Sequence, residues 1–131
     1  MTAAREAIQA FLACRVFAVV GVSENPTKFG HQVFRCYLEH GRTAYPIHPR
    51  LTELLGRTVY RSLDAVPEAP EAVSIITPPA VTEEILPGLI AAGVRHVWMQ
   101  PGAESPQAVQ AARDAGLSVI AGGPCLLVEM E

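Results

Sequence analysis

The sequence predicts an α/β fold, a Rossmann-like, doubly wound domain with a mainly parallel five-stranded sheet and helices on both faces. Five short apolar runs predict the strands. Between several of them lie stretches with helical periodicity, each followed by a glycine, the usual residue after a helix. Strand and helix segments that alternate in this way form βαβ units, whose right-handed crossovers give a parallel sheet.

The predicted strands are the apolar runs at 16–20, 43–47, 72–77, 96–99 and 118–121. The second run contains Pro46, and proline removes a donor from the hydrogen-bond ladder of a strand. We therefore expect Pro46 near the carboxyl end of its strand.

Helices are predicted where the apolar residues recur at helical spacing. The predicted segments are an N-terminal helix within 1–15 that packs on the core, and helices at 31–40, 79–92 and 106–115. Ser105 is the expected N-cap of the last of these, with a proline at its first helical position. The segment 49–70 is interrupted by Gly56 and Pro67, which predicts a turn, an extended piece and a helical turn.

Length and composition indicate one domain, residues 1–131, in the cytoplasm. Half of the 131 residues are apolar, and the formal net charge of −3 argues against a general nucleic-acid-binding protein. No run approaches the roughly 20 apolar residues of a membrane span. The three cysteines, Cys14, Cys36 and Cys125, have neither disulfide-framework nor metal-ligand spacing, so we expect reduced thiols and no metal site.

The loop Gly21–Gly30 joins the first strand to the next helix, an arrangement that binds phosphate at a helix N-terminus. Lys28, the single lysine of the chain, adds a cation to this loop. Because arginine carries the other basic charges, the rarity of lysine also fits a compositional bias. His31 lies in the first helical turn and is the histidine most expected to touch a ligand, although a structural role is preferred for all four.

The other strands end in segments that we expect to meet the loop at one edge of the sheet, where α/β proteins bind ligands. These segments are 48–50, 77–79, 100–102 and 122–125. Each has a structural alternative: His48 could build a turn, Thr77 could cap a helix, and Gln100 could tie down a loop. The convergence of the segments is stronger evidence than any one of them.

The loop departs from known nucleotide fingerprints. A dinucleotide fingerprint needs glycine where Ser23 and Pro26 stand, and a P-loop needs serine or threonine directly after Lys28, where this chain has phenylalanine. After the second strand, Arg50 stands near the place of the acidic residue that holds the ribose of NAD. The sequence therefore favours an adenosine with a ribose phosphate, as in NADP or coenzyme A (CoA).

Five segments in a fixed order resemble the small stand-alone CoA-binding domain proteins, which are related to the N-terminal domain of the succinyl-CoA synthetase α subunit. These segments are GVSENPTKFG at 21–30, PIHPR at 46–50, LLG at 54–56, WMQPG at 98–102, and Cys125 followed by Val128-Glu129. The resemblance covers the chain from about Val16 onward. It implies a Rossmann-like CoA-binding fold without an established catalytic activity.

The resemblance also implies roles for residues of the loop. Ser23 and Lys28 would contact the pyrophosphate, and Gly21 and Val22 would let the backbone approach it. Gly30 closes the loop before the helix.

Beyond the second and third strands, the resemblance places His48 and Arg50 near the adenosine and its ribose phosphate. Thr77 and Pro78 would line the pocket. Asparagine is commoner in the family at the position of His48, and a basic or acidic pair often precedes the cysteine where this chain has Gly123-Pro124.

The leading functional prediction is a non-catalytic module that binds CoA or an acyl-CoA, as a carrier, a sensor or the partner of an acyl-CoA enzyme. No catalytic constellation is visible, and a packed Cys125 is favoured over one that forms a mixed disulfide with CoA. The alternatives are an NADP-binding oxidoreductase domain and an interaction protein that has lost its ligand. Whether the chain forms a homo-oligomer is left open.

Overall fold

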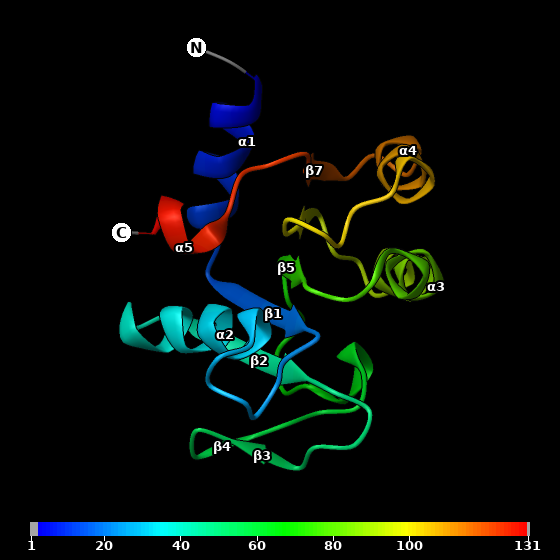
Figure 1. Cartoon of the computed structure of the whole chain (residues 1–131). Helices are drawn as coiled ribbons and strands as arrows, with labels where there is room; N and C mark the ends of the chain where they lie inside the picture. Colours follow the sequence, from blue (N-terminus) through cyan, green and yellow to red (C-terminus); the bar gives the residue numbers. More distant parts are fainter. Residues whose placement is uncertain (1–2, 131) are drawn as a thin grey trace.

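The structure, a computed structural model, describes residues 3–130 and is built around a parallel five-stranded sheet (Figure 1). The strand order is β2-β1-β5-β6-β7. The strands are β1 (Val16–Val20), β2 (Thr43–Ile47), β5 (Ala72–Ile75), β6 (His96–Met99) and β7 (Ser118–Ile120). The predicted fold class is confirmed, and three strands have the predicted bounds, whereas β5 and β7 end slightly earlier than expected.

The helices lie on both faces of the sheet. Figure 1 shows α1 (Ala3–Leu12), α2 (Phe29–Glu39) and α5 (Leu126–Glu129) on one side, and α3 (Pro79–Ala91) and α4 (Pro106–Asp114) on the other. The strand order explains why the crossover helices cover both faces. The chain moves outward from β1 to β2 and then back across β1 to β5. Because the crossovers are right-handed, connections that run in opposite directions lie on opposite faces of the sheet. Within residues 3–130, no helix is both long and apolar enough to span a bilayer.

Aromatic residues fill the core on the face covered by α1 and α2. The ring centroids of Phe11 and Trp98 lie 5.2 Å apart in an edge-to-face arrangement, and those of Phe17 and Tyr37 lie 4.9 Å apart. All four side chains are at most 1% exposed. Aromatic pairs at such distances stabilise a core beyond the area they bury.

The connection from β2 to β5 contains no α-helix. It consists of the antiparallel hairpin β3 (Glu53–Leu54) and β4 (Arg57–Thr58), followed by the three-residue 3-10 helix η1 (Leu63–Ala65). The predicted extended piece and helical turn are confirmed, although the extended piece folds back on itself as a hairpin.

Pro46 is accommodated because β2 is an edge strand and the Pro46 nitrogen faces outward. The Ile47 carbonyl accepts from the Gly21 N–H on the β1 side, at 3.4 Å, so the neighbouring Pro46 faces away from β1. On that outer side the Pro46 carbonyl accepts from the Tyr60 N–H at 2.9 Å, and the Tyr60 carbonyl accepts from the His48 N–H at 2.9 Å. Pro46 is the fourth of the five residues of β2, as predicted.

Candidate functional site

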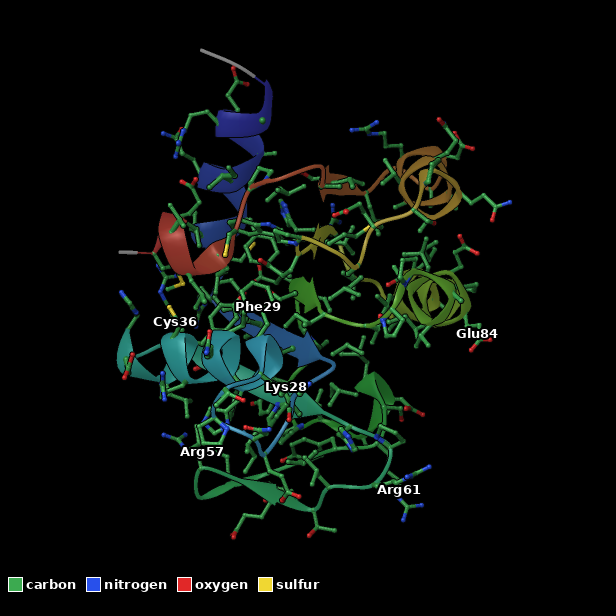
Figure 2. The ribbon with its side chains drawn as sticks, in the orientation of Figure 1. Lys28, Phe29, Cys36, Arg57, Arg61 and Glu84 are labelled. Atoms are coloured by element: carbon green, nitrogen blue, oxygen red, sulfur yellow. The ribbon has the colours of Figure 1, made fainter. Side chains whose placement is uncertain are left out.

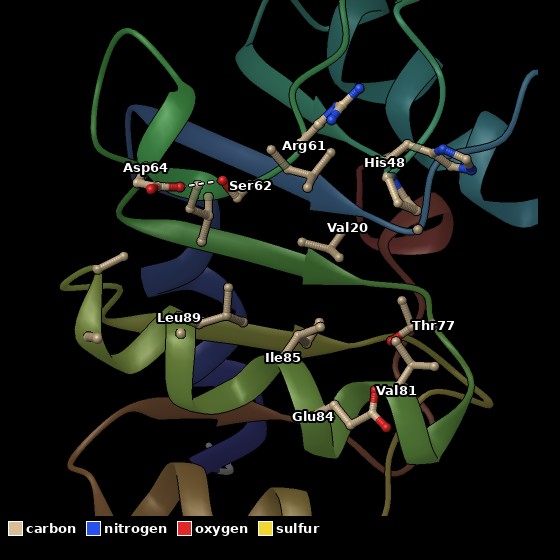
Figure 3. A pocket seen from close by; sticks show the side chains of 17 residues that line it. Val20, His48, Arg61, Ser62, Asp64, Thr77, Val81, Glu84, Ile85 and Leu89 are labelled. Carbon is tan, nitrogen blue, oxygen red and sulfur yellow. Dashed lines mark hydrogen bonds between the residues drawn. The ribbon is translucent and has the colours of Figure 1, made fainter.

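A cavity of about 700 Å³ opens at the carboxyl ends of β1 and β2 (Figure 3). It lies between α3 and the segment that holds η1. A crossover helix would cover this part of the sheet, but η1 has only three residues and leaves it open. The wall is largely apolar, formed by side chains that include Val20, Ile47, Leu63, Val81, Ile85 and Leu89. Its volume and character fit a small-molecule site.

The loop between β1 and α2 begins at the wall of this cavity. Gly21 lines the cavity and has a φ of +100°, which favours glycine. A Cβ on Gly30 would lie 2.1 Å from the Gly21 carbonyl oxygen, so the two ends of the loop pack together only because Gly30 lacks a side chain. The predicted loop is therefore folded back onto the start of α2.

Side chains within the loop organise its backbone. The Ser23 hydroxyl accepts from the Asn25 N–H at 3.1 Å, and the Asn25 side-chain carbonyl accepts from the Thr27 N–H at 3.0 Å. Val22 is buried, at 3% exposure. The structure therefore gives Ser23 and Val22 structural contacts next to the predicted phosphate position.

The N-terminus of α2 is suited to an anion. Its N-cap residue, Lys28, makes no side-chain cap, which leaves the first-turn amides without an oxygen acceptor from that position. Lys28 itself is exposed. His31, 4% exposed, has Nδ1 3.0 Å from the Ser23 carbonyl, and because a carbonyl only accepts, Nδ1 is the donor. His31 thus fastens the first turn of α2 to the loop.

His48 lines the cavity from the end of β2. Its Nδ1 accepts from the N–H groups of Arg50 and Leu51, at 3.0 Å each. Two donors on Nδ1 mean that this nitrogen carries no hydrogen, so in the neutral ring Nε2 does. The local turn therefore fixes the tautomer and gives His48 an N–H donor.

The predicted site residues fall into three groups. Gly21, His48 and Thr77 line the cavity. Val22, Ser23, Lys28, Gly30 and His31 form the adjoining loop and the start of α2. Arg50, Pro78 and Gln100 are not among the described residues that line the cavity.

Gln100 has a different place from the other predicted residues. Its side chain is fully buried, and its Oε1 accepts from the Leu126 N–H at 3.0 Å, at the start of α5. Its Nε2 has no hydrogen-bond partner among the described residues. The structure thus provides the loop-tying contact that was the structural alternative.

The cavity also has lining residues that the sequence did not point to. They include Arg61 and Asp64 on one wall and Glu84 on α3. Glu84 belongs to the α3 face that also contains Val81 and Leu89, so helical spacing could have indicated it. No pattern among the sequence neighbours of Arg61 indicates it, because the long-range pairing of Tyr60 with β2 places Arg61 at the cavity. Figure 2 shows the Arg61 side chain extending outward from this end of the molecule.

The cysteines lie outside the lining of the cavity. Burial raises the pKa of the Cys36 thiol, with a smaller contribution from Glu39, which disfavours a reactive thiolate. All three cysteines are free, and Cys125 is half-buried at the N-cap of α5. In the described part of the chain, no three histidine, cysteine or acidic side chains are placed to hold a metal ion. The cavity thus lies beside a loop that leads to the N-terminus of α2.

Comparisons with known proteins agree with this geometry. A family model described as "CoA binding domain" matches residues 15–131. The α subunit of acetate–CoA ligase [ADP-forming] II from Pyrococcus furiosus is 32% identical over 73 residues, which are 55% of this chain and 16% of that subunit. This chain therefore corresponds to a small part of that relative.

Solved structures share the fold. A structure from Thermus thermophilus is 30% identical, with a TM-score of 0.87 over 98% of this chain and 96% of that one. The dinucleotide-forming acetyl-coenzyme A synthetase 1 of Ca. Korarchaeum cryptofilum, in complex with phosphate and ADP, is 28% identical, with a TM-score of 0.73. That match covers 82% of this chain and 25% of the synthetase chain.

Proposed function

Because this chain belongs to the CoA-binding domain family, we propose that it binds CoA or an acyl-CoA, without catalysis, in the cavity beside the Gly21–Gly30 loop. The observation that carries the proposal is that the apolar cavity continues directly into the loop before α2. Gly21 lines the apolar cavity and also begins the loop that leads to the N-terminus of α2. A ligand with an uncharged aromatic base at one end and a pyrophosphate beside it fits both.

The phosphate end of the ligand would lie at the start of α2. There the first-turn amides and the positive end of the helix dipole favour an anion. Lys28 is exposed at this N-cap and would supply a cation, while the Ser23 hydroxyl lies in the same loop. These contacts do not depend on which acyl group, if any, the ligand has.

The adenosine would lie in the cavity, between the end of β2 and α3. Val20, Ile47 and Val81 provide apolar contacts for the base. His48 offers its Nε2–H to an acceptor on the nucleoside, because Nδ1 is already occupied by two backbone donors. Thr77 closes the cavity on the side of β5.

The biological role that we propose is that of a carrier, a sensor or the partner of an acyl-CoA enzyme. The relatives named as a CoA ligase subunit and as an acetyl-CoA synthetase, each longer than this chain, support a link to acyl-CoA chemistry. Three free cysteines are consistent with the reducing conditions of a cytoplasm.

Calorimetric titration of the purified protein with CoA, acetyl-CoA, dephospho-CoA, NADP, NAD and ATP tests the proposal. We expect CoA or acetyl-CoA to bind more tightly than the other nucleotides. Tighter binding of NADP than of CoA would favour the oxidoreductase alternative, and absence of binding by any of them would favour a fold that has lost its ligand.

The variant Lys28→Ala tests the loop. We expect it to weaken CoA binding by about 1–3 kcal/mol, the range for hydrogen bonds to charged groups. The matched control is Arg113→Ala, which removes a cation from the last turn of α4, at the opposite edge of the sheet. Equal affinity of the wild type and Lys28→Ala would assign Lys28 to the solvated surface.

A further inference from the structure

We infer that Arg61 holds the ribose phosphate of the bound nucleotide, so that the cavity distinguishes CoA from dephospho-CoA. The inference rests on the proposed binding of CoA and adds the residue that reads this phosphate. Of the described residues that line the cavity, Arg61 is the one with a guanidinium group. A planar guanidinium donates two parallel hydrogen bonds to a phosphate and remains charged at all relevant pH values.

Backbone pairing fixes the position of Arg61. Tyr60 forms a parallel bridge with Ile47, and its N–H and carbonyl bond to Pro46 and His48, at 2.9 Å each. Tyr60 therefore extends the sheet beyond its edge strand, and Arg61 follows at the carboxyl end of β2. The Arg61 backbone is thus held beside His48, although the two residues are 13 positions apart in the chain.

The Arg61 guanidinium is available for a ligand. The ion pairs of the described residues are Arg5–Glu129 and Arg35–Glu39, and neither involves Arg61. Asp64, the nearby acidic residue, accepts a hydrogen bond from the Ser62 hydroxyl. Figure 3 shows Asp64 and Arg61 extending to different sides of this segment, so the carboxylate does not cover the guanidinium.

The position of Glu84 also favours a ligand whose ribose phosphate lies at Arg61. Glu84 lies on the α3 wall, away from Arg61 and His48 (Figure 3). A phosphate is repelled from Glu84 and attracted to Arg61, whereas the uncharged base meets no such penalty in the apolar middle of the cavity. The charges thus point the phosphorylated ribose toward the wall formed by residues 48 and 61.

Arg50 is the alternative that the sequence suggested. It follows His48, but its N–H and that of Leu51 donate to His48 Nδ1 as the chain turns toward the β3–β4 hairpin. Both arginines are exposed, and of the two it is Arg61 that lines the cavity. Arg50 adds positive charge outside the cavity, while Arg61 stands at its wall.

The experiment compares the affinities for CoA and dephospho-CoA, since the two differ only in the ribose phosphate. We expect the wild type to prefer CoA by about tenfold to a hundredfold, as for a hydrogen bond to a charged group. In Arg61→Gln this preference should fall to about twofold or less, while the affinity for dephospho-CoA stays unchanged. Arg50→Gln and the distant control Arg113→Gln should keep the preference.

The other outcomes are distinct from one another. A preference that is lost in Arg50→Gln and kept in Arg61→Gln would overturn the inference and leave the proposed CoA binding intact. So would a wild type that binds CoA and dephospho-CoA equally well. A wild type that binds neither would overturn the proposed function and the inference together.

Discussion

At the scale of single residues, His48 has a backbone role that explains why two different residues can serve at its position. Its Nδ1 accepts from the N–H groups of Arg50 and Leu51. The side-chain oxygen of asparagine, the residue expected more often in the resembling proteins, accepts in a similar way from the backbone N–H two residues further on. The chemical requirement is an acceptor at this distance from the backbone.

We therefore expect His48→Asn to keep the turn and His48→Ala to break it. The alanine variant should lose about 0.5–1.5 kcal/mol of unfolding free energy, the net range for an intramolecular hydrogen bond, because two partly solvated backbone donors lose their acceptor. The asparagine variant should stay within about 0.5 kcal/mol of the wild type, as for a neutral surface substitution. Urea denaturation without ligand measures both, and equal losses in the two variants would contradict the role given to Nδ1.

At the scale of elements, a buried hydrogen bond joins α2 to the centre of the sheet. The Tyr37 hydroxyl lies 2.7 Å from Ser74 Oγ on β5, and both residues are 0% exposed. Burial raises the pKa of the Tyr37 hydroxyl far above its usual range, so the group stays neutral. This bond helps to set the position of α2, whose N-terminus faces the proposed phosphate.

Removing both partners should cost less than the sum of the two single removals. Tyr37→Phe and Ser74→Ala should each lower the unfolding free energy by about 1–3 kcal/mol, because each leaves a buried polar group unpaired. The double variant should lose less than the sum of the two, with a coupling of about 0.5–3 kcal/mol for residues in contact. Chemical denaturation of the four proteins measures this, and strictly additive losses would show that the bond does not couple the elements.

At the scale of the whole molecule, the carboxyl ends and the amino ends of the strands have different chemistry. The cavity proposed to bind the ligand lies at the carboxyl ends of the strands, whereas Glu71 and His96 lie at the amino ends of β5 and β6. The N–H groups of Arg15 and Val16 donate to the Glu71 carboxylate and lower its pKa below 4.5. Burial lowers the pKa of His96 below 6.5, although Glu71 partly opposes this.

The lowered pKa values of Glu71 and His96 mean that the folded state favours the deprotonated form of each group. Their contributions to the free energy of unfolding are therefore present at neutral pH and are lost as the pH falls. The loss from His96 should begin as the pH falls below 6.5 and that from Glu71 below 4.5. The denaturation midpoint, measured from about pH 7.5 to 4, should fall. Glu71→Gln should flatten the acidic part of the curve, and a midpoint that rises between neutral pH and about pH 5.5 would contradict the prediction.

Features coded by neighbouring residues could be predicted from the sequence. The bounds of β1, β2 and β6 agree with their apolar runs, and Ser105 caps α4 by accepting from the Ala108 N–H, as predicted. The loop after β1 was predictable as well, because strand, glycine loop and helix follow one another directly. Arg61 could not be found in this way, because a sheet pairing between residues 47 and 60 places it.

The sequence by itself determined the α/β class, the order of its elements, the loop with Lys28 and the family to which the chain belongs. These depend on periodicity, turn residues and short motifs, which act over a few neighbouring positions. Only the tertiary structure decided that Gln100 is buried under α5, that Arg50 lies outside the cavity and that Arg61 stands at its wall. The physical reason is that these positions depend on which strands pair and which crossover lacks a helix.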